Sequence, residues 1–168
     1  MMRFASSAHP TDTAPKGDRI IYPVNTRLVL ASERILLALW VGSLWVAGFV
    51  VAPLLFAELD DRALAGSVAG SLFTLTSYIG LVCGSLLLLV NGTVFRCINW
   101  RLVVIVCMLL LVAVGQFVIT PMVADLRVQG LSGTPRFGQL HGLASVLFII
   151  TSVLGLLLVA AGQQGRDQ

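Results

Sequence analysis

The sequence predicts an all-α protein, a four-transmembrane-helix bundle with both termini cytoplasmic, and three observations support this fold class. First, 57% of the 168 residues are hydrophobic and only 11% are charged, whereas soluble domains carry about 25% charged residues. Second, four apolar runs lack Asp, Glu, Lys and Arg, and each has the ~20 residues that an α-helix needs to cross a bilayer. Third, no run alternates in polarity as membrane-barrel strands do. The lipid bilayer is therefore the first expected partner.

The chain divides into three parts. Residues 1–24 are polar and turn-rich, which predicts a disordered cytoplasmic tail that lacks the features of a signal peptide. Residues 25–162 contain all four apolar runs and are expected to form the transmembrane domain. Residues 163–168 are expected to form a short cytoplasmic tail.

The four apolar runs define the expected helices in order. They are Ile35–Phe56, Leu64–Val90, Leu102–Ala124 and His141–Gly162. Pro53 should bend the outer end of the first helix. Asp60 and Asp61 are suited to cap the second helix. Thr134 followed by Pro135 predicts that the fourth helix starts before its apolar run.

Positive charges predict the orientation in the membrane. Eight basic residues fall on one side, namely Arg3, Lys16, Arg19, Arg27, Arg34, Arg96, Arg101 and Arg166. Three fall on the other side, namely Arg62, Arg127 and Arg136. Because Lys and Arg gather on the cytoplasmic side, both termini are expected in the cytoplasm.

Residues at the membrane boundaries can also be assigned. Glu33 and Arg34 are expected to form a charged pair at the cytoplasmic rim, with their heads reaching toward water. Trp100 and Trp40 fit the aromatic belts that flank membrane helices. Trp45 lies too deep for a belt and is expected to pack between helices.

Glycines predict how the helices pack. The second helix carries two G-x-x-x-G pairs, Gly66–Gly70 and Gly80–Gly84. The first and fourth helices add Gly42 and Gly142. Small residues let membrane helices approach closely, so these positions are expected to hold the bundle together or to dock a second copy or other membrane subunits.

Several function classes find no support in the sequence. There is no P-loop, no dinucleotide-binding glycine pattern, no HExxH and no GxSxG, and these motifs carry much of known catalytic chemistry. The net charge of +3 is small and spread along the chain, which argues against nucleic-acid binding. His141 is the only histidine in the apolar runs, so ligation of a haem by two histidines within the chain is excluded. We therefore expect no enzyme and no cofactor.

Polar residues inside the apolar runs suggest a site. His141, Ser145 and Ser152 share one face of the fourth helix, and Gln116 and Thr120 share a face of the third. If these faces converge, they form a polar cavity open to the outer side. Alternatively, the hydroxyls bond their own backbone and Gln116 bonds a neighbouring helix.

A metal site is a second, separate hypothesis. Cys83 and Cys107 lie at similar depth in their helices, and thiolates favour soft metals such as Cu(I). His141 is a further candidate ligand. Lone buried cysteines more often act as small apolar side chains, and the odd number of three cysteines argues against a disulfide framework.

Two stretches resemble a known family. They are LWVGSLWVAGFVVAPLLFAELDDRALAGSVAGSLF (39–73) and RFGQLHGLASVLF (136–148). The second stretch carries Phe137, His141, Gly142, Leu143 and Ser145. This resembles the four-helix membrane family of largely uncharacterised bacterial proteins, a domain of unknown function, that includes the vertebrate transmembrane protein linked to platinum-drug resistance. The resemblance covers about residues 28–160 and implies an integral four-helix membrane protein without implying a reaction.

Two functions from different classes remain open. The first is a small transport-type or solute- or metal-binding protein, whose outward-facing polar cavity is lined by His141, Ser145 and Gln116. The second is a structural or assembly subunit whose glycine faces dock other membrane helices.

Overall fold

The structure is a computed structural model, and it describes residues 24–94 and 100–164. All four apolar runs fall within these ranges. Most of both predicted tails and Cys97 lie outside the described residues.

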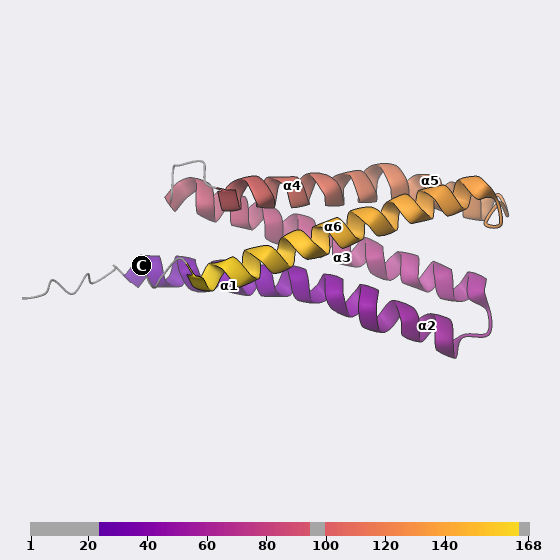
Figure 1. Cartoon of the computed structure of the whole chain (residues 1–168), viewed down its shortest axis with the longest axis horizontal. Helices are drawn as coiled ribbons and strands as arrows, with labels where there is room; N and C mark the ends of the chain where they lie inside the picture. Colours follow the sequence, from indigo (N-terminus) through magenta and orange to yellow (C-terminus); the bar gives the residue numbers. More distant parts are fainter. Residues whose placement is uncertain (1–23, 95–99, 165–168) are drawn as a thin grey trace, which may run out of the picture.

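Four long helical spans make up the described chain (Figure 1). The first span consists of α1 (Val24–Trp45), a π-helical turn η1 (Val46–Val51) and α2 (Ala52–Glu58). The second is α3 (Arg62–Val94). The third consists of α4 (Trp100–Val114), a π-helical turn η2 (Gly115–Ile119) and α5 (Thr120–Val128), and the fourth is α6 (Pro135–Gln164). Each span contains a segment long and apolar enough to cross a bilayer, so the chain is a multi-pass membrane protein.

The spans are arranged around a ring. The first span packs against the second and fourth, and the third packs against the same two neighbours. The described chain begins and ends at the same end of the bundle (Figure 1), as an even number of crossings requires. The first and third spans therefore run parallel to each other, and the second and fourth run parallel to each other in the opposite direction.

Both prolines of the first and third spans follow a π-helical turn. The N–H of Ala52, directly before Pro53, donates to the carbonyl of Ala47 five residues back. The N–H of Thr120, directly before Pro121, donates in the same way to Gly115. Proline lacks an N–H and its ring clashes with the carbonyl four residues back. A turn closed over five residues moves that carbonyl away, which lets the helix continue through the membrane.

Two of the expected caps are confirmed. The Oδ1 atom of Asp61 accepts hydrogen bonds from the N–H groups of Ala63 (2.8 Å) and Leu64 (3.2 Å) at the start of α3. Thr134 Oγ1 accepts from the N–H of Phe137 at 3.4 Å, and α6 begins at Pro135. These caps satisfy N–H groups that a helix start leaves without partners.

The core lies along the centre of the ring. It is built from nine buried side chains that all spans contribute: Leu37, Trp40, Leu44, Cys83, Leu87, Ile105, Met108, Val112 and Leu158. Trp40 is 0% exposed, so its expected place in an interfacial belt is wrong. Trp45 was expected to pack between helices, but it is exposed and meets only the edge of Phe49 among the described rings.

The G-x-x-x-G pairs of α3 accommodate side chains. A Cβ atom on Gly80 would collide with the indole of Trp40, and one on Gly84 would lie 2.8 Å from Trp40 Cζ3. The Gly66–Gly70 pair lies under the guanidinium of Arg127, with Nη2 3.5 Å from a Cβ on Gly66 and Nη1 3.4 Å from a Cβ on Gly70. The Gly66–Gly70 pair therefore provides space for Arg127, and the Gly80–Gly84 pair provides space for Trp40 and for Leu109, whose Cδ2 lies 2.6 Å from a Cβ on Gly84.

Two of the expected packing glycines take no part in contacts within the chain. A Cβ on Gly42 or Gly142 would meet no atom within 4 Å. Both positions therefore face the outside of the bundle, where lipid or another membrane protein lies.

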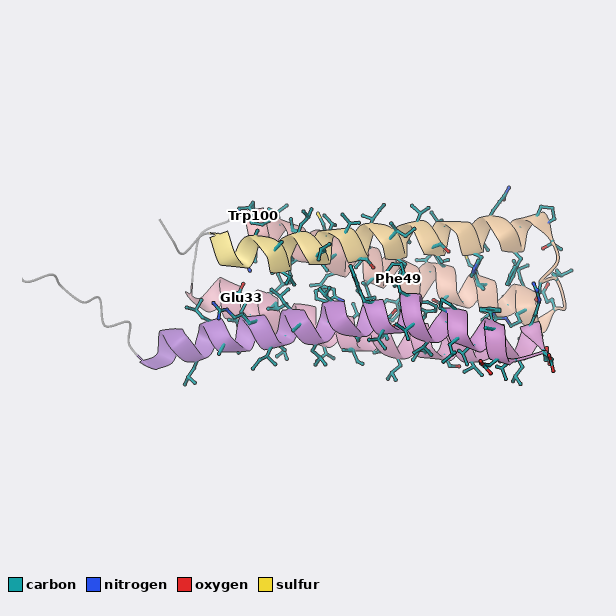
Figure 2. The ribbon with its side chains drawn as sticks, turned by 60° about the horizontal axis from the view of Figure 1, so that its bottom comes forward. Glu33, Phe49 and Trp100 are labelled. Carbon is teal, nitrogen blue, oxygen red and sulfur yellow. The ribbon has the colours of Figure 1, made fainter. Side chains whose placement is uncertain are left out.

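The ion pair at the end of the bundle where the described chain begins differs from the expected one. Glu33, 7% exposed, accepts a charged hydrogen bond from Arg101 Nη2 of α4 at 2.7 Å, while Arg34 is exposed. Figure 2 places Glu33 near Trp100, the residue beside Arg101, at one end of the bundle. The expected pairing of Glu33 with Arg34 is wrong because neighbours in a helix point about 100° apart, and only Glu33 faces the third span.

Candidate functional site

The structure divides the predicted polar residues into two groups. Gln116 and Ser152 are buried, at 8% and 4% exposure, while His141 and Ser145 are exposed. Thr120 is half-buried, and its Oγ1 donates to the carbonyl of Gly115 at 2.9 Å. The five residues therefore do not line one continuous surface.

The exposed group forms a small unit on α6. The rings of His141 and Phe137 stack, with centroids 6.2 Å apart and an angle of 3° between the planes. Ser145 Oγ donates to the carbonyl of His141 at 2.9 Å. For Ser145 the alternative interpretation, a hydroxyl bonded to its own helix, is therefore confirmed.

The buried group includes a residue that the sequence interpretation left out. Gln116 Oε1, Ser152 Oγ and Trp40 Nε1 are buried and have no hydrogen-bond partner among the described residues. A buried polar group without a partner destabilises a protein by about 1–3 kcal/mol. Three such groups are within the number that a native protein of this size carries, but each calls for a partner such as a bound water, ion or ligand.

Helix contacts locate these atoms along the bundle. A Cβ on Gly155 would lie 3.2 Å from Met108 Cε, so these two residues are level. Ser152 lies three residues and Gln116 eight residues from that level, both toward the end formed by the α5–α6 turn. At 1.5 Å per residue, the two polar side chains are separated along the axis by about 8 Å. They are too far apart to satisfy each other directly.

An aromatic cluster lies beside this polar stretch. The Phe148 ring contacts those of Phe49 and Phe73, with centroid distances of 5.8 Å and 5.7 Å. Phe148 also fills the space that a side chain at Gly48 would take. In Figure 2 Phe49 lies about midway along the bundle. Because Phe148 is one turn from Ser152 on α6, the cluster covers Ser152 on the side of the α5–α6 turn and lies at about the level of Gln116.

The candidate metal ligands are not gathered. Cys83 is buried in the core, whereas Cys107 is exposed, and both are free thiols. His141 is exposed on α6 and stacks on Phe137. Within residues 24–94 and 100–164, no group of three or more His, Cys, Asp or Glu side chains is placed to hold a metal ion.

One open groove lies on the surface between α1 and α3. It has a volume of about 300 Å³ and is lined by Leu39, Tyr78, Ile79, Val82 and Cys83. Its exposed lining is entirely apolar. It therefore offers no groups that orient a polar ligand, and the buried polar atoms are the better candidate site.

Trp40 was not predicted as part of the site because the sequence gives its depth along the helix but not the direction in which its side chain points. The sequence did carry a usable signal, since a G-x-x-x-G pair on one helix provides the space that a large side chain from another helix requires. Gln116 was found because an amide side chain in a charge-free apolar run is uncommon, and Ser152 because it shares a helix face with His141.

Comparison with known proteins identifies a family. The family model described as "Domain of unknown function (DUF4149)" matches residues 35–132, more than half of the chain. Neither the curated proteins nor the solved structures give a match. The matched segment contains most of the first three spans, including both π-helical turns and Gln116. The chain therefore belongs to the DUF4149 family.

Proposed function

We propose that this protein binds a small polar solute inside its bundle and acts as a small transport-type membrane protein. The observation that carries the proposal is the burial of Gln116 Oε1 and Ser152 Oγ without hydrogen-bond partners among the described residues. In a membrane interior, no bulk water reaches such groups to satisfy them. A bound solute or the waters that accompany it would supply the missing bonds.

The orientation in the membrane belongs to the same proposal. With both termini in the cytoplasm of a bacterial inner membrane, the α5–α6 turn faces outward, and His141 and Ser145 lie near the outer entrance. The relation to the vertebrate protein linked to platinum-drug resistance is also part of the proposal.

Solute flux into reconstituted vesicles tests the proposal. Vesicles containing the full chain are mixed with glycerol or urea as uncharged probes, and shrinkage and recovery are followed by light scattering. We expect Gln116→Leu and Ser152→Ala to slow recovery about fivefold, the loss that one hydrogen bond accounts for. Ser71→Ala is the matched control, because Ser71 is exposed and bonded to its own helix.

Stability separates a lost site from a lost fold. Replacing a buried polar group that has no partner by an apolar one removes a desolvation penalty. Gln116→Leu should therefore unfold at the same or a higher temperature than the wild-type protein. Wild-type vesicles that recover no faster than empty vesicles for either probe would rule out transport of this solute class.

Gly42 and Gly142 favour the second candidate function, a structural or assembly subunit. Neither glycine has an atom of its own chain within 4 Å of an added Cβ, which leaves room for a helix of another subunit. Gly42→Leu and Gly142→Leu should then abolish co-purification of a membrane partner without lowering stability. A chain that purifies as a monomer from mild detergent argues against this function.

A further inference from the structure

The two halves of the chain share sequence. LFTLTSYIGL (72–81) in the second span and LFIITSVLGL (147–156) in the fourth are identical at six of ten positions. FVVAP (49–53) in the first span and FVITP (117–121) in the third share Phe, Val and Pro. Equivalent residues are thus 68 positions apart in the first and third spans and 75 apart in the second and fourth.

The structures of the halves agree with this alignment. Each half consists of a span interrupted by a π-helical turn before proline, followed by a continuous helix. Equivalent positions are buried alike, as the pairs Leu37 and Ile105, Trp40 and Met108, and Leu44 and Val112 show. On the continuous helices, Gly80 lies against Trp40, and its equivalent Gly155 lies 3.2 Å, measured from an added Cβ, from Met108.

Equivalent residues also touch each other across the bundle. Phe73 contacts Phe148 with ring centroids 5.7 Å apart, and Glu33 pairs with Arg101 at 2.7 Å. Contact between equivalent residues is the signature of a two-fold axis passing between them. Because the halves run in the same direction, this axis lies along the bundle, as in membrane proteins with parallel repeats.

We infer that the two halves are structural repeats and that the solute binds on their shared axis, between Thr76–Ser77 of α3 and Thr151–Ser152 of α6. The inference rests on the proposed function and adds the residues of the first half to the site. Thr76 and Thr151 are buried, at 4% and 2% exposure. They are equivalent residues on helices that meet at the Phe73–Phe148 contact one turn away.

Thr76, Ser77, Thr151 and Ser152 form what we call the hydroxyl layer. The hydroxyl groups of this layer can hold a ligand that both donates and accepts hydrogen bonds. Thr76 Oγ1 donates to the carbonyl of Phe73 at 3.0 Å, and Thr151 Oγ1 donates to that of Leu147 at 2.8 Å. Each oxygen keeps lone pairs that can accept. Ser152 can donate or accept, and Trp40 Nε1 one turn away can only donate.

The charge of the layer selects the ligand class. The apolar cores of the spans contain no Asp, Glu, Lys or Arg, and Glu33 and Arg101 neutralise each other seven positions before Trp40 and Met108. An ion in the layer would have no compensating charge in a medium of low dielectric constant. The ligand is therefore a small uncharged molecule with hydrogen-bond donors and acceptors, for which glycerol and urea are suitable probes.

The layer is closed at both sides in the structure. Phe73 and Phe148 cover it toward the α5–α6 turn, and Trp40 and Met108 fill the centre on the opposite side. A solute can reach it only when the two halves separate at one end. Gln116 breaks the symmetry, because its equivalent is Gly48, whose side-chain space is filled by Phe148.

Symmetric substitutions in the two halves test the inference. Thr76→Val and Ser77→Ala in the first half are compared with Thr151→Val and Ser152→Ala in the second, using glycerol and urea flux into vesicles containing the full chain. The inference predicts a loss of about fivefold for each of the four variants. Ser71→Ala, which removes an exposed hydroxyl bonded to its own helix, should leave the flux unchanged.

A chemical measurement keeps the test valid if one variant folds poorly. Ser77→Cys and Ser152→Cys are introduced singly into a chain whose native cysteines are replaced by serine or alanine. Excess urea or glycerol should slow the reaction of both thiols with a small uncharged maleimide at least about twofold, and should not slow the reaction of Ser71→Cys.

The outcomes separate the inference from the proposed function. If Gln116→Leu and Ser152→Ala lose flux while Thr76→Val and Ser77→Ala do not, the axial site is wrong and the proposed function stands. If vesicles containing the wild-type chain take up neither probe faster than empty vesicles, the proposed function and the axial site are both wrong. Equal losses in the two halves, with protection of both thiols, support the axial site.

Discussion

The indole of Trp40 lies against the backbone of Gly80 so closely that no side chain fits between them. Trp40 comes from the first span and is 0% exposed, and Gly84 one turn along α3 completes its seat. In lipid, such packing of a large side chain against glycines replaces the hydrophobic drive that holds soluble helices together. The contact therefore joins the two helices of the first half.

Gly80→Ala should destabilise the protein by about 1–3 kcal/mol, the range for overpacked cores. Its added methyl group would overlap the Trp40 ring, which is held on the opposite side by the core. Thermal unfolding in detergent is the measurement. Gly42→Ala is the control, because it meets nothing within 4 Å and should stabilise the helix by up to about 1 kcal/mol. Equal shifts for both variants would contradict a seat at Gly80.

Cys107 and Cys83 should differ in reactivity toward an apolar maleimide in detergent. Cys107 is exposed on α4, whereas Cys83 is 3% exposed within the core. Mass spectrometry of a Cys97→Ser chain should show Cys107 modified at least about tenfold faster, because Cys83 exposes only 3% of its surface at the wall of the groove between α1 and α3. Equal rates for the two thiols would show that α3 is not packed as described.

The termini should both report a cytoplasmic location. The structure places the beginning of α1 and the end of α6 at the same end of the bundle, and the positive charges near that end predict that it faces the cytoplasm. A carboxyl-terminal green fluorescent protein should fluoresce and a carboxyl-terminal alkaline phosphatase should be inactive. An active phosphatase at Gly133, between α5 and α6, is the matched control. The reverse pattern would invert the bundle in the membrane.

Local sequence patterns predicted the four spans and the starts of the second and fourth helices. Apolar length determines where a helix can cross a bilayer, and Asp61 and Thr134 cap their helices through contacts with residues two or three positions away. Such features depend on neighbours in the sequence, so they can be predicted without knowledge of the fold.

Contacts between spans were predicted less well. Trp40 and Trp45 were assigned by depth, yet their environments depend on the angle at which each leaves the helix. Glu33 pairs with Arg101, 68 positions away, whereas the neighbouring Arg34 was the expected partner. The π-helical turns also rotate the helix that follows them, so a face extrapolated with a regular period is displaced there. The sequence predicted Gln116 and Ser152 as site residues. That they are buried and lie apart from the exposed His141 could be seen only in the structure.

Replacing either member of the Glu33–Arg101 ion pair by a neutral residue should lower the stability of the protein. The side chains of the pair are only 10% and 22% exposed, so Glu33→Gln leaves a largely buried guanidinium without a counter-charge and should destabilise the protein by about 3 kcal/mol. Arg101→Gln should destabilise the protein by a similar amount, because it leaves the largely buried Glu33 carboxylate without a counter-charge. The exchanged pair, Glu33→Arg with Arg101→Glu, should recover most of the loss, and a double-mutant cycle of unfolding free energies in detergent measures the coupling.

Arg34→Gln is the matched control at the adjacent, exposed position and should change stability by less than about 0.5 kcal/mol. If the losses of unfolding free energy in the cycle are additive, the two charges act separately. The ion pair then does not join the two halves at the end of the bundle where α1 begins.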